Sequence, residues 1–378
     1  MIKLKNAVIL TPFREIKYGE VLYNGKTITA VGKKLPPAEK EFDLNGMYLA
    51  PGFIDLHIHG GPGYTFSTDN VKELRHSLKE VAKHGVTSVL PVTPDPNEKL
   101  VSAYKEVMHD VDGPELLGNH MEAIDQEHVY PEDDIKNIKK RPDYSNPEIY
   151  EDLLNHVPIL KIIGVDPGLP GAIDMTRFFV LNEVKVSASH CGSVTYDQFI
   201  ACVESGMDCN THIYSGMSGF YRDLKNGARY PGLIEDCLMS PDILSEVIGD
   251  GIHLTGVMLD LIYKLKGESG IYLATDSQSS PAKLKPGENP IKTNKINGKV
   301  HIFSVASMDY VIKKTISCSS IPLLSAIRMA TYNPAKLIGL ENRKGKIAVG
   351  CDADFVVFDK DFNIHSVIAR GSTIYNYV

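Results

Sequence analysis

The sequence predicts an α/β protein built on a (β/α)8 barrel, to which both ends of the chain add a small β-sandwich. From residue 53 onward, strand-like and helix-like segments alternate, which is typical of parallel β/α units. Eight strand-like segments can be counted, and eight is the number that closes a barrel. By contrast, strand-and-turn character is found in residues 2–11, 20–32, 345–359 and 364–378.

The strands predicted for the barrel are residues 53–59, 87–93, 115–122, 159–165, 186–191, 209–214, 248–253 and 271–276. Apolar residues with helical spacing lie between most of them, as in residues 70–85 and 97–111, and predict helices that cover the sheet. A doubly wound open sheet is the competing fold. No Gly-x-Gly-x-x-Gly follows any of these strands, which favours the barrel.

Both ends of the chain are predicted to be β-rich. Asn24-Gly25, within a stretch of alternating residues, predicts a two-residue hairpin turn. Short β segments need partners to be stable, so we expect the two ends to form one sandwich. The predicted domains are residues 1–50 together with 345–378 for the sandwich, and residues 51–344 for the catalytic barrel.

Composition limits the classes of function. Forty basic and forty-seven acidic residues give a net charge of −7, which does not suggest a nucleic-acid partner. No apolar run approaches the roughly 18 residues of a membrane span, and residues 1–6 lack the apolar core of a signal peptide. The six cysteines are scattered without a Cys-x-x-Cys and are expected to be reduced. We therefore expect a cytoplasmic protein with no membrane partner.

The first predicted barrel strand ends in His57-Ile58-His59. Because side chains alternate along a strand, both histidines project from the same face and can chelate one metal ion. Two polar residues at the end of a buried strand are the alternative interpretation, which a short motif alone does not exclude.

Four more polar residues lie at or near the ends of other predicted strands: Glu122, His190, His212 and Asp276. Functional residues of such barrels lie at the carboxyl ends of the strands. A lone histidine there is more often structural, so the inference rests on several residues converging. Their nitrogen and oxygen donors suit one or two ions of Zn²⁺, Fe²⁺ or Mn²⁺, and a nearby carboxylate such as Asp276 can carry a proton. The sequence thus predicts metal-assisted hydrolysis.

The chain resembles the amidohydrolase superfamily and, within it, the N-acetylglucosamine-6-phosphate deacetylase family. The motifs that carry the resemblance are residues 51–60, 120–122, 189–190, 211–214, 229–232, 250–253, 275–276, 333–335 and 350–354. They span nearly the whole chain. The resemblance implies a hydrolase that removes the acetyl group from an N-acetylated amino-sugar 6-phosphate.

The resemblance also implies roles for single residues. Glu122, His190 and His212 would hold the principal metal ion, and His57 with His59 would permit a second. Asp276 would be the general base and acid. His253 would act near the acyl group and orient the substrate.

Arg229 would bind the sugar phosphate across the interface of a homodimer, a role that suits a guanidinium group. A solvated surface arginine is the alternative.

Two loops depart from the family pattern, and residues 277–284, after Asp276, lack its glycine-rich form. Ala123-Ile124 follows Glu122 in place of glycine-proline, and Ser215-Gly216 replaces asparagine-alanine in a loop expected to contact the substrate. His128 is a candidate replacement for a sugar-contacting histidine of the family. Three alternatives therefore stay open. The protein could act on another N-acyl sugar such as N-acetylgalactosamine-6-phosphate, it could act on a cyclic amide, or it could be a non-catalytic scaffold. The presence of all the candidate ligands together with Asp276 argues against the scaffold.

Overall fold

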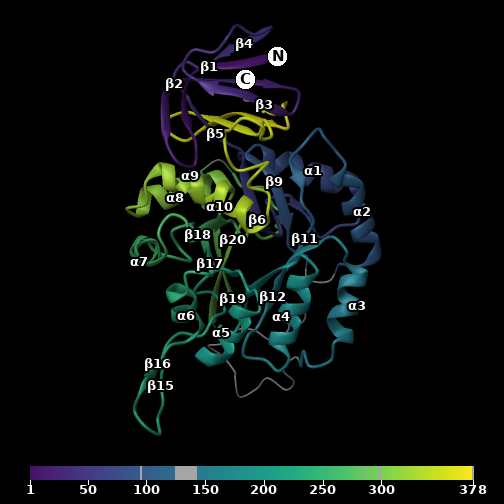
Figure 1. The fold of residues 1–378 in the computed structure, drawn as a ribbon, viewed down its shortest axis with the longest axis vertical. Coiled ribbons are helices and arrows are strands. Elements are labelled where there is room, and N and C mark those ends of the chain that lie inside the picture. The colour runs from purple at the N-terminus through teal and green to yellow at the C-terminus, as the bar shows by residue number, and fades with distance from the viewer. Residues whose placement is uncertain (94–95, 124–142, 286, 297–298, 377–378) are drawn as a thin grey trace.

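The computed structural model describes residues 1–93, 96–123, 143–285, 287–296 and 299–376. A barrel of strands and helices carries a smaller β-structured part, in which the two ends of the chain lie side by side at the top of Figure 1. Within the described residues, no helix is both long and apolar enough to cross a membrane.

Parallel strands form the wall of the barrel. They are β6 (Phe53–Ile58), β9 (Val86–Pro91), β10 (Glu115–Leu116), β11 (Asn119–Met121), β12 (Leu160–Val165), β13 (Lys185–Ala188), β14 (Cys209–Asn210), β17 (Leu244–Ile248) and β18 (Ile271–Ala274). Hydrogen bonds connect them in the orders β10-β9-β6 and β11-β12-β13-β14-β17-β18. Parallel bridges between Val92 and His120 and between Ile58 and Ser277 close the ring. With β10 and β11 as one interrupted strand, the predicted eight-stranded barrel is confirmed.

Helices alternate with these strands and cover them (Figure 1). They are α1 (Val71–Ala82), α2 (Glu98–Met108), α3 (Glu148–His156), α4 (Ala172–Leu181), α5 (Tyr196–Glu204), α6 (Leu233–Met239), α7 (Gly256–Lys266), α8 (Met308–Cys318), α9 (Leu323–Met329) and α10 (Tyr332–Leu337). Helix α1 illustrates why these segments form helices that pack on the barrel. The Asn70 side chain accepts a hydrogen bond from the Lys72 backbone N–H, and Leu74, Leu78 and Val81 form a buried stripe.

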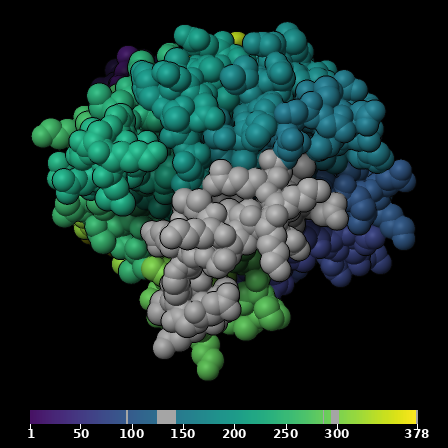
Figure 2. Space-filling model, turned by 90° about the horizontal axis from the view of Figure 1, so that it is seen from below, coloured from purple at the N-terminus to yellow at the C-terminus, as the bar shows by residue number. Residues whose placement is uncertain are grey.

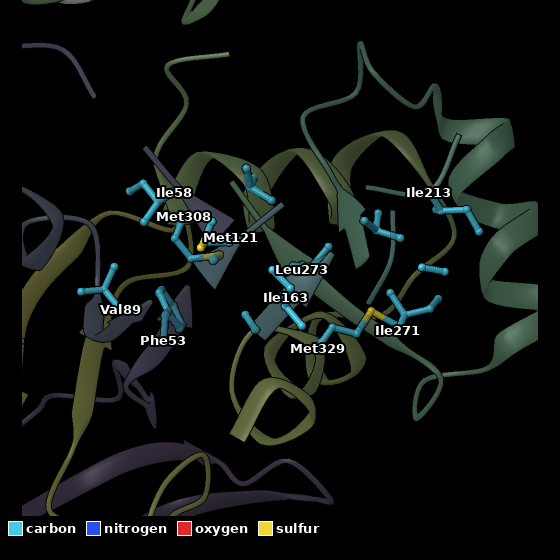
Figure 3. Packing of buried hydrophobic residues seen from close by; sticks show 14 of the residues in the cluster. Phe53, Ile58, Val89, Met121, Ile163, Ile213, Ile271, Leu273, Met308 and Met329 are labelled. Carbon is cyan, nitrogen blue, oxygen red and sulfur yellow. The ribbon is translucent and has the colours of Figure 1, made fainter. Parts of the chain in front are cut away.

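The main hydrophobic core lies between the strands and the covering helices. Figure 3 shows Phe53 and Ile58 of β6 and Val89 of β9 in this cluster, together with Met308 and Met329 from the last helices. Each fully buried side chain of this size contributes roughly 1.5–3 kcal/mol. This packing fixes the strands on which the site is built.

Strands from both termini form one further sheet. They are β1 (Ile2–Leu10), β2 (Glu15–Asn24), β3 (Thr27–Gly32), β4 (Lys40–Asp43), β5 (Tyr48–Pro51), β21 (Phe355–Phe358), β22 (Ile364–Ala369) and β23 (Ser372–Asn376). The order is β23-β22-β21-β5-β1-β2-β3, and β4 also pairs with β1. The antiparallel pairing of β5 with β21 joins the two ends of the chain. The predicted domain boundaries stay a prediction.

Two local predictions need correction. The hairpin turn consists of Gly25 and Lys26, because Asn24 still pairs with Thr27. The strand predicted at 248–253 is β17, which ends at Ile248. The carboxylate of Asp250 accepts the backbone N–H groups of Ile252 and His253 and so folds that segment into a turn.

Short antiparallel pairs lie outside the barrel wall. They are β7 (Gly60–Gly61) with β8 (Tyr64–Thr65), β15 (Tyr221–Arg222) with β16 (Arg229–Tyr230), and β19 (Ile291–Ile296) with β20 (Lys299–Ser304). The β15–β16 hairpin projects away from the barrel at the lower left of Figure 1.

The carboxyl ends of the barrel strands lie away from the terminal sheet. Only Gly52 separates β5 of that sheet from β6, so β6 begins beside the sheet and ends at the far side of the barrel (Figure 1). Figure 2 shows the molecule from that side, where the teal and green segments from the middle of the chain form much of the surface.

Candidate metal centre

The predicted site residues gather where the barrel strands end. His57 lies in β6, and the others follow shortly after strands: His59 after β6, Glu122 after β11, His190 after β13, His212 after β14 and Asp276 after β18. Three of them have a positive φ, at +46° for His190, +21° for His212 and +45° for Asp276. Such a backbone is uncommon outside glycine and concentrates at functional sites.

One group of donors consists of His57, His59, Glu122 and Asp276, whose nearest ligand atoms all lie within 4.8 Å of one another. Nε2 of His57 is 2.5 Å from Oε1 of Glu122, and Nε2 of His59 is 3.3 Å from the same oxygen. Both Nε2 atoms are 3.3 Å from Oδ1 of Asp276. The two histidines of the first strand therefore point to one position.

A second group consists of Glu122, His190 and His212, whose ligand atoms also lie within 4.8 Å of one another. Nε2 of His190 lies 3.3 Å from Oε2 of Glu122, the oxygen that does not face His57. Glu122 therefore belongs to both groups and offers one oxygen to each.

The spacing of these atoms fits a metal ion. Donors at about 2.0–2.2 Å from a tetrahedral ion are about 3.3–3.5 Å from one another. The separations of 3.3 Å between Glu122 and His59, Glu122 and His190, and Asp276 and both first-strand histidines match this spacing. The contact of 2.5 Å between His57 and Glu122 is a hydrogen bond, and these two atoms would have to separate around an ion. Imidazole and carboxylate donors are also the set preferred by zinc, iron and manganese.

Hydrogen bonds on the far ring nitrogens orient two of the histidines. Nδ1 of His57 donates to Oε1 of Glu246 at 2.7 Å, and Nδ1 of His212 donates to the carbonyl oxygen of Ser215 at 3.1 Å. Each bond places a proton on Nδ1 and directs Nε2 toward the other donors, which is the usual arrangement for metal-binding histidines.

The electrostatics of the site favour positive charge. Burial by itself would lower the pKa of His57, but the carboxylates of Glu246, Asp276 and Glu122 outweigh it and raise that pKa well above its ordinary value. Burial likewise opposes protonation of His59, yet hydrogen bonds with Asp276 and Glu122 raise its pKa to about 9. Carboxylates packed this closely create a strongly negative position in which a cation is stabilised.

Asp276 is held in place from two directions. Its backbone N–H donates to the carbonyl oxygen of His57 at 2.9 Å, and the side chain of Gln278 donates to Oδ1 at 2.9 Å. Burial would raise the pKa of Asp276, but the charge of His57 and the hydrogen bonds from both histidines hold it below the ordinary range. Asp276 is therefore an ionised carboxylate, as a proton acceptor must be.

His253 stands on the turn after β17. Its Nδ1 donates to Oδ2 of Asp250 at 2.7 Å, and the ring also hydrogen-bonds the backbone of Ile302. Burial opposes its protonation, but the hydrogen bond with Asp250 raises the pKa of His253. His253 belongs to neither donor group, and Asp276 is close enough to contribute to its pKa.

The structure places the other predicted residues differently. Ser215 and Gly216 contact the histidines, since Ser215 accepts from His212 and a Cβ on Gly216 would lie 2.7 Å from Nδ1 of His190. Arg229 is exposed on the projecting β15–β16 hairpin and is not among the residues gathered at the barrel rim (Figure 1). His128 lies outside the described residues.

Sequence reasoning missed two buried residues beside the donors, Glu246 and His120. Glu246 lies in β17, and the strand predicted there began after it. A single carboxylate within an otherwise apolar strand was the available signal, because such groups are rarely buried without a partner. His120 donates from Nδ1 to the carbonyl oxygen of Leu56 at 2.9 Å, and burial lowers its pKa to about 4.

A (β/α)8 barrel with shared histidine and carboxylate donors at its carboxyl end defines a class of hydrolases that can hold divalent metal. Comparison with known proteins agrees, because the Amidohydrolase family matches residues 48–374. The chain belongs to the amidohydrolase family and is a hydrolase acting on C–N bonds.

Individual relatives are similar over most of their length. A Caenorhabditis elegans protein named N-acetylglucosamine-6-phosphate deacetylase is 30% identical over 367 residues, covering 89% of this chain and 85% of that protein. A Haemophilus influenzae protein of the same name is 28% identical, covering 97% and 98%. The crystal structure of that deacetylase from Pasteurella multocida superposes with a TM-score of 0.81 at 25% identity, covering 99% and 100%.

Proposed function

We propose that the protein is a cytoplasmic, metal-dependent deacetylase of an N-acetylated amino-sugar 6-phosphate, releasing acetate and the free amine. The observation that carries the proposal is Glu122, whose two oxygens face two donor groups, and Asp276 belongs to the first of these groups. The relatives named N-acetylglucosamine-6-phosphate deacetylase support the choice of substrate.

Residues of both groups would hold divalent metal. Glu122, His190 and His212 would bind the principal ion, and His57 with His59 would bind a second. Zinc, iron and manganese are the candidates that suit this donor set. When bound, such an ion lowers the pKa of a water molecule toward about 7 and polarises the acetyl carbonyl.

Asp276 would carry the proton. As an ionised carboxylate at the edge of the first donor group, it accepts a proton from the water that adds to the acetyl carbon. It then returns that proton to the amine nitrogen as the C–N bond breaks. His253, whose ring is held by Asp250 and by the backbone of Ile302, would orient the substrate beside the acyl group.

The β15–β16 hairpin suggests how the sugar phosphate is bound. Phe220 and Leu224, next to β15, are 68% and 93% exposed, and Tyr221 and Tyr230 of the hairpin strands are exposed as well, so that apolar side chains gather on this one element. A second copy of the chain would cover them, and Arg229 would then reach the phosphate in the partner's barrel. Arg229→Ala should raise the KM for a phosphorylated substrate about ten- to a hundred-fold, because a hydrogen bond to a charged group is lost. Slow turnover of the unphosphorylated sugar should not change.

A substrate panel tests the proposal. The kcat/KM for acetate release is measured on N-acetylglucosamine and N-acetylgalactosamine, each with and without a 6-phosphate, using the wild-type protein and Arg229→Ala. We expect a clear preference for the phosphorylated sugars. Preference for the galactosamine epimer would change the assignment of the substrate but leave the proposed deacetylation in place. No acetate from any of the four, with turnover of a cyclic amide instead, would contradict the proposal.

A further inference from the structure

Glu246 is a carboxylate beneath the donor groups that no solvent reaches, with a relative exposure of 0%. It lies in the middle of β17, where Glu246 pairs with Tyr272 of β18. Its oxygens accept three hydrogen bonds from three strand or loop segments. Oε1 accepts from Nδ1 of His57 at 2.7 Å and from the backbone N–H of His212 at 2.9 Å, and Oε2 accepts from the hydroxyl of Tyr272 at 2.7 Å.

A buried carboxylate costs several kcal/mol of desolvation unless partners compensate for it. Replacing such a group with apolar side chains is often neutral or stabilising, so stability alone explains its presence poorly. Two of the three donors to Glu246 belong to residues of the candidate metal centre. The same oxygen, Oε1, serves both of them.

The two contacts act on different donor groups. The bond to His57 fixes the ring so that Nε2 points at Oε1 of Glu122, at 2.5 Å. The bond to His212 fixes a backbone with φ of +21°, which an L-residue rarely adopts without support. The side chain of Glu246 therefore orients one histidine in each donor group, and Glu122 belongs to both groups.

We propose that Glu246 is a positioning residue that orients His57 and His212 for metal binding and strengthens His57 as a ligand through its negative charge. The inference rests on the proposed function only in requiring that these histidines bind metal. Carboxylates behind metal-binding histidines typically contribute about 10- to 100-fold to metal affinity.

Glu246→Gln is the variant that tests it, because glutamine keeps the shape and an acceptor oxygen but loses the charge. Zn²⁺ affinity is measured on the full-length protein, stripped with a chelator, by competition with a chromogenic chelator and without substrate. Glu115→Gln is the matched control. It makes the same chemical change at a carboxylate paired with Arg343 and Lys344 at the opposite end of the barrel.

The effect should depend on His57. We expect Glu246→Gln to weaken Zn²⁺ binding about 10- to 100-fold while Glu115→Gln leaves it nearly unchanged. In the His57→Gln background the same Glu246→Gln change should have a much smaller effect, because residues that act through each other are not additive. Thermal unfolding identifies any variant that has lost its fold.

The outcomes separate the two proposals. If wild-type protein binds none of Zn²⁺, Fe²⁺ and Mn²⁺ in this competition, the proposed metal-dependent function fails, and the role of Glu246 fails with it. If the wild type binds Zn²⁺ tightly and folded Glu246→Gln binds it equally well, only the role of Glu246 is overturned. An equal loss in the presence and absence of His57 would overturn the claim that Glu246 acts through that histidine.

Discussion

Oε1 of Glu122 lies 2.5 Å from Nε2 of His57, while the other oxygen of the same carboxylate faces His190 at 3.3 Å. A carboxylate placed in this way can bridge two ions. Glu122→Gln should therefore remove most of the bound metal and reduce acetate release by orders of magnitude. Elemental analysis and kcat of the purified variant measure both effects. Glu148→Gln, at an exposed position of α3, is the control that should match the wild type in both.

Asp276 is expected to contribute to turnover more than to metal binding. Asp276→Asn should retain most of the metal, because His57, His59 and Glu122 remain, but lower kcat about 100- to 10,000-fold, because the proton carrier is lost. Metal content and kcat are measured on the same preparation. Near-normal turnover would remove Asp276 from the mechanism.

Gly216 provides a test of how tightly the histidine rings are held. A Cβ at this position would lie 2.7 Å from Nδ1 of His190. Gly216→Ala should therefore displace the ring and reduce both metal affinity and activity.

Gly339→Ala is the matched control for this change. Gly339 has a similar positive φ, +72° against +62°, but nothing lies within 4 Å of its added Cβ. Both variants should lose stability because alanine disfavours this backbone, and only Gly216→Ala should lose metal. An equal loss of metal in both would show that strain, and not contact with His190, is responsible.

Glu115 joins the barrel to the segment that leads to the C-terminal strands. Burial would raise the pKa of Glu115, but the hydrogen bond from Arg343 and the charge of Lys344 outweigh it and lower the pKa to about 2. The unfolded value is about 4.3, so the ionised carboxylate stabilises the fold above that pH and this contribution is lost as the pH falls toward 2. Glu115→Gln should be less stable than the wild type at pH 6, and the difference should narrow by pH 3.5. Denaturant unfolding at several pH values measures it, and a constant difference would contradict the assignment.

The fold and most of the donors could be predicted because their signals are local. His57 and His59 stand two residues apart in one strand, and the strand-ending Glu122 and Asp276 follow short apolar runs. Each of these patterns is readable without knowing what lies opposite in space. The alternation of strands and helices then places the carboxyl ends of the strands on one rim.

The remaining features depend on contacts between distant segments. Glu246 is 189 residues from His57, and nothing around it in the sequence indicates that pairing. The seventh barrel strand was predicted too late: β17 ends at Ile248, and hydrogen bonds to the carboxylate of Asp250 fold the residues that follow into a turn. The predicted contact of Ser215 with substrate likewise gave no sign that its carbonyl oxygen would orient His212.

The dependence of acetate release on metal tests the central claim most directly. Protein stripped with a chelator and dialysed is assayed on N-acetylglucosamine-6-phosphate, then again after addition of Zn²⁺, Fe²⁺ or Mn²⁺ in turn. We predict that the stripped protein releases almost no acetate and that at least one of the three ions restores activity in proportion to the metal bound. Full acetate release by the stripped protein, or none after reloading with any of the three ions, would contradict the account.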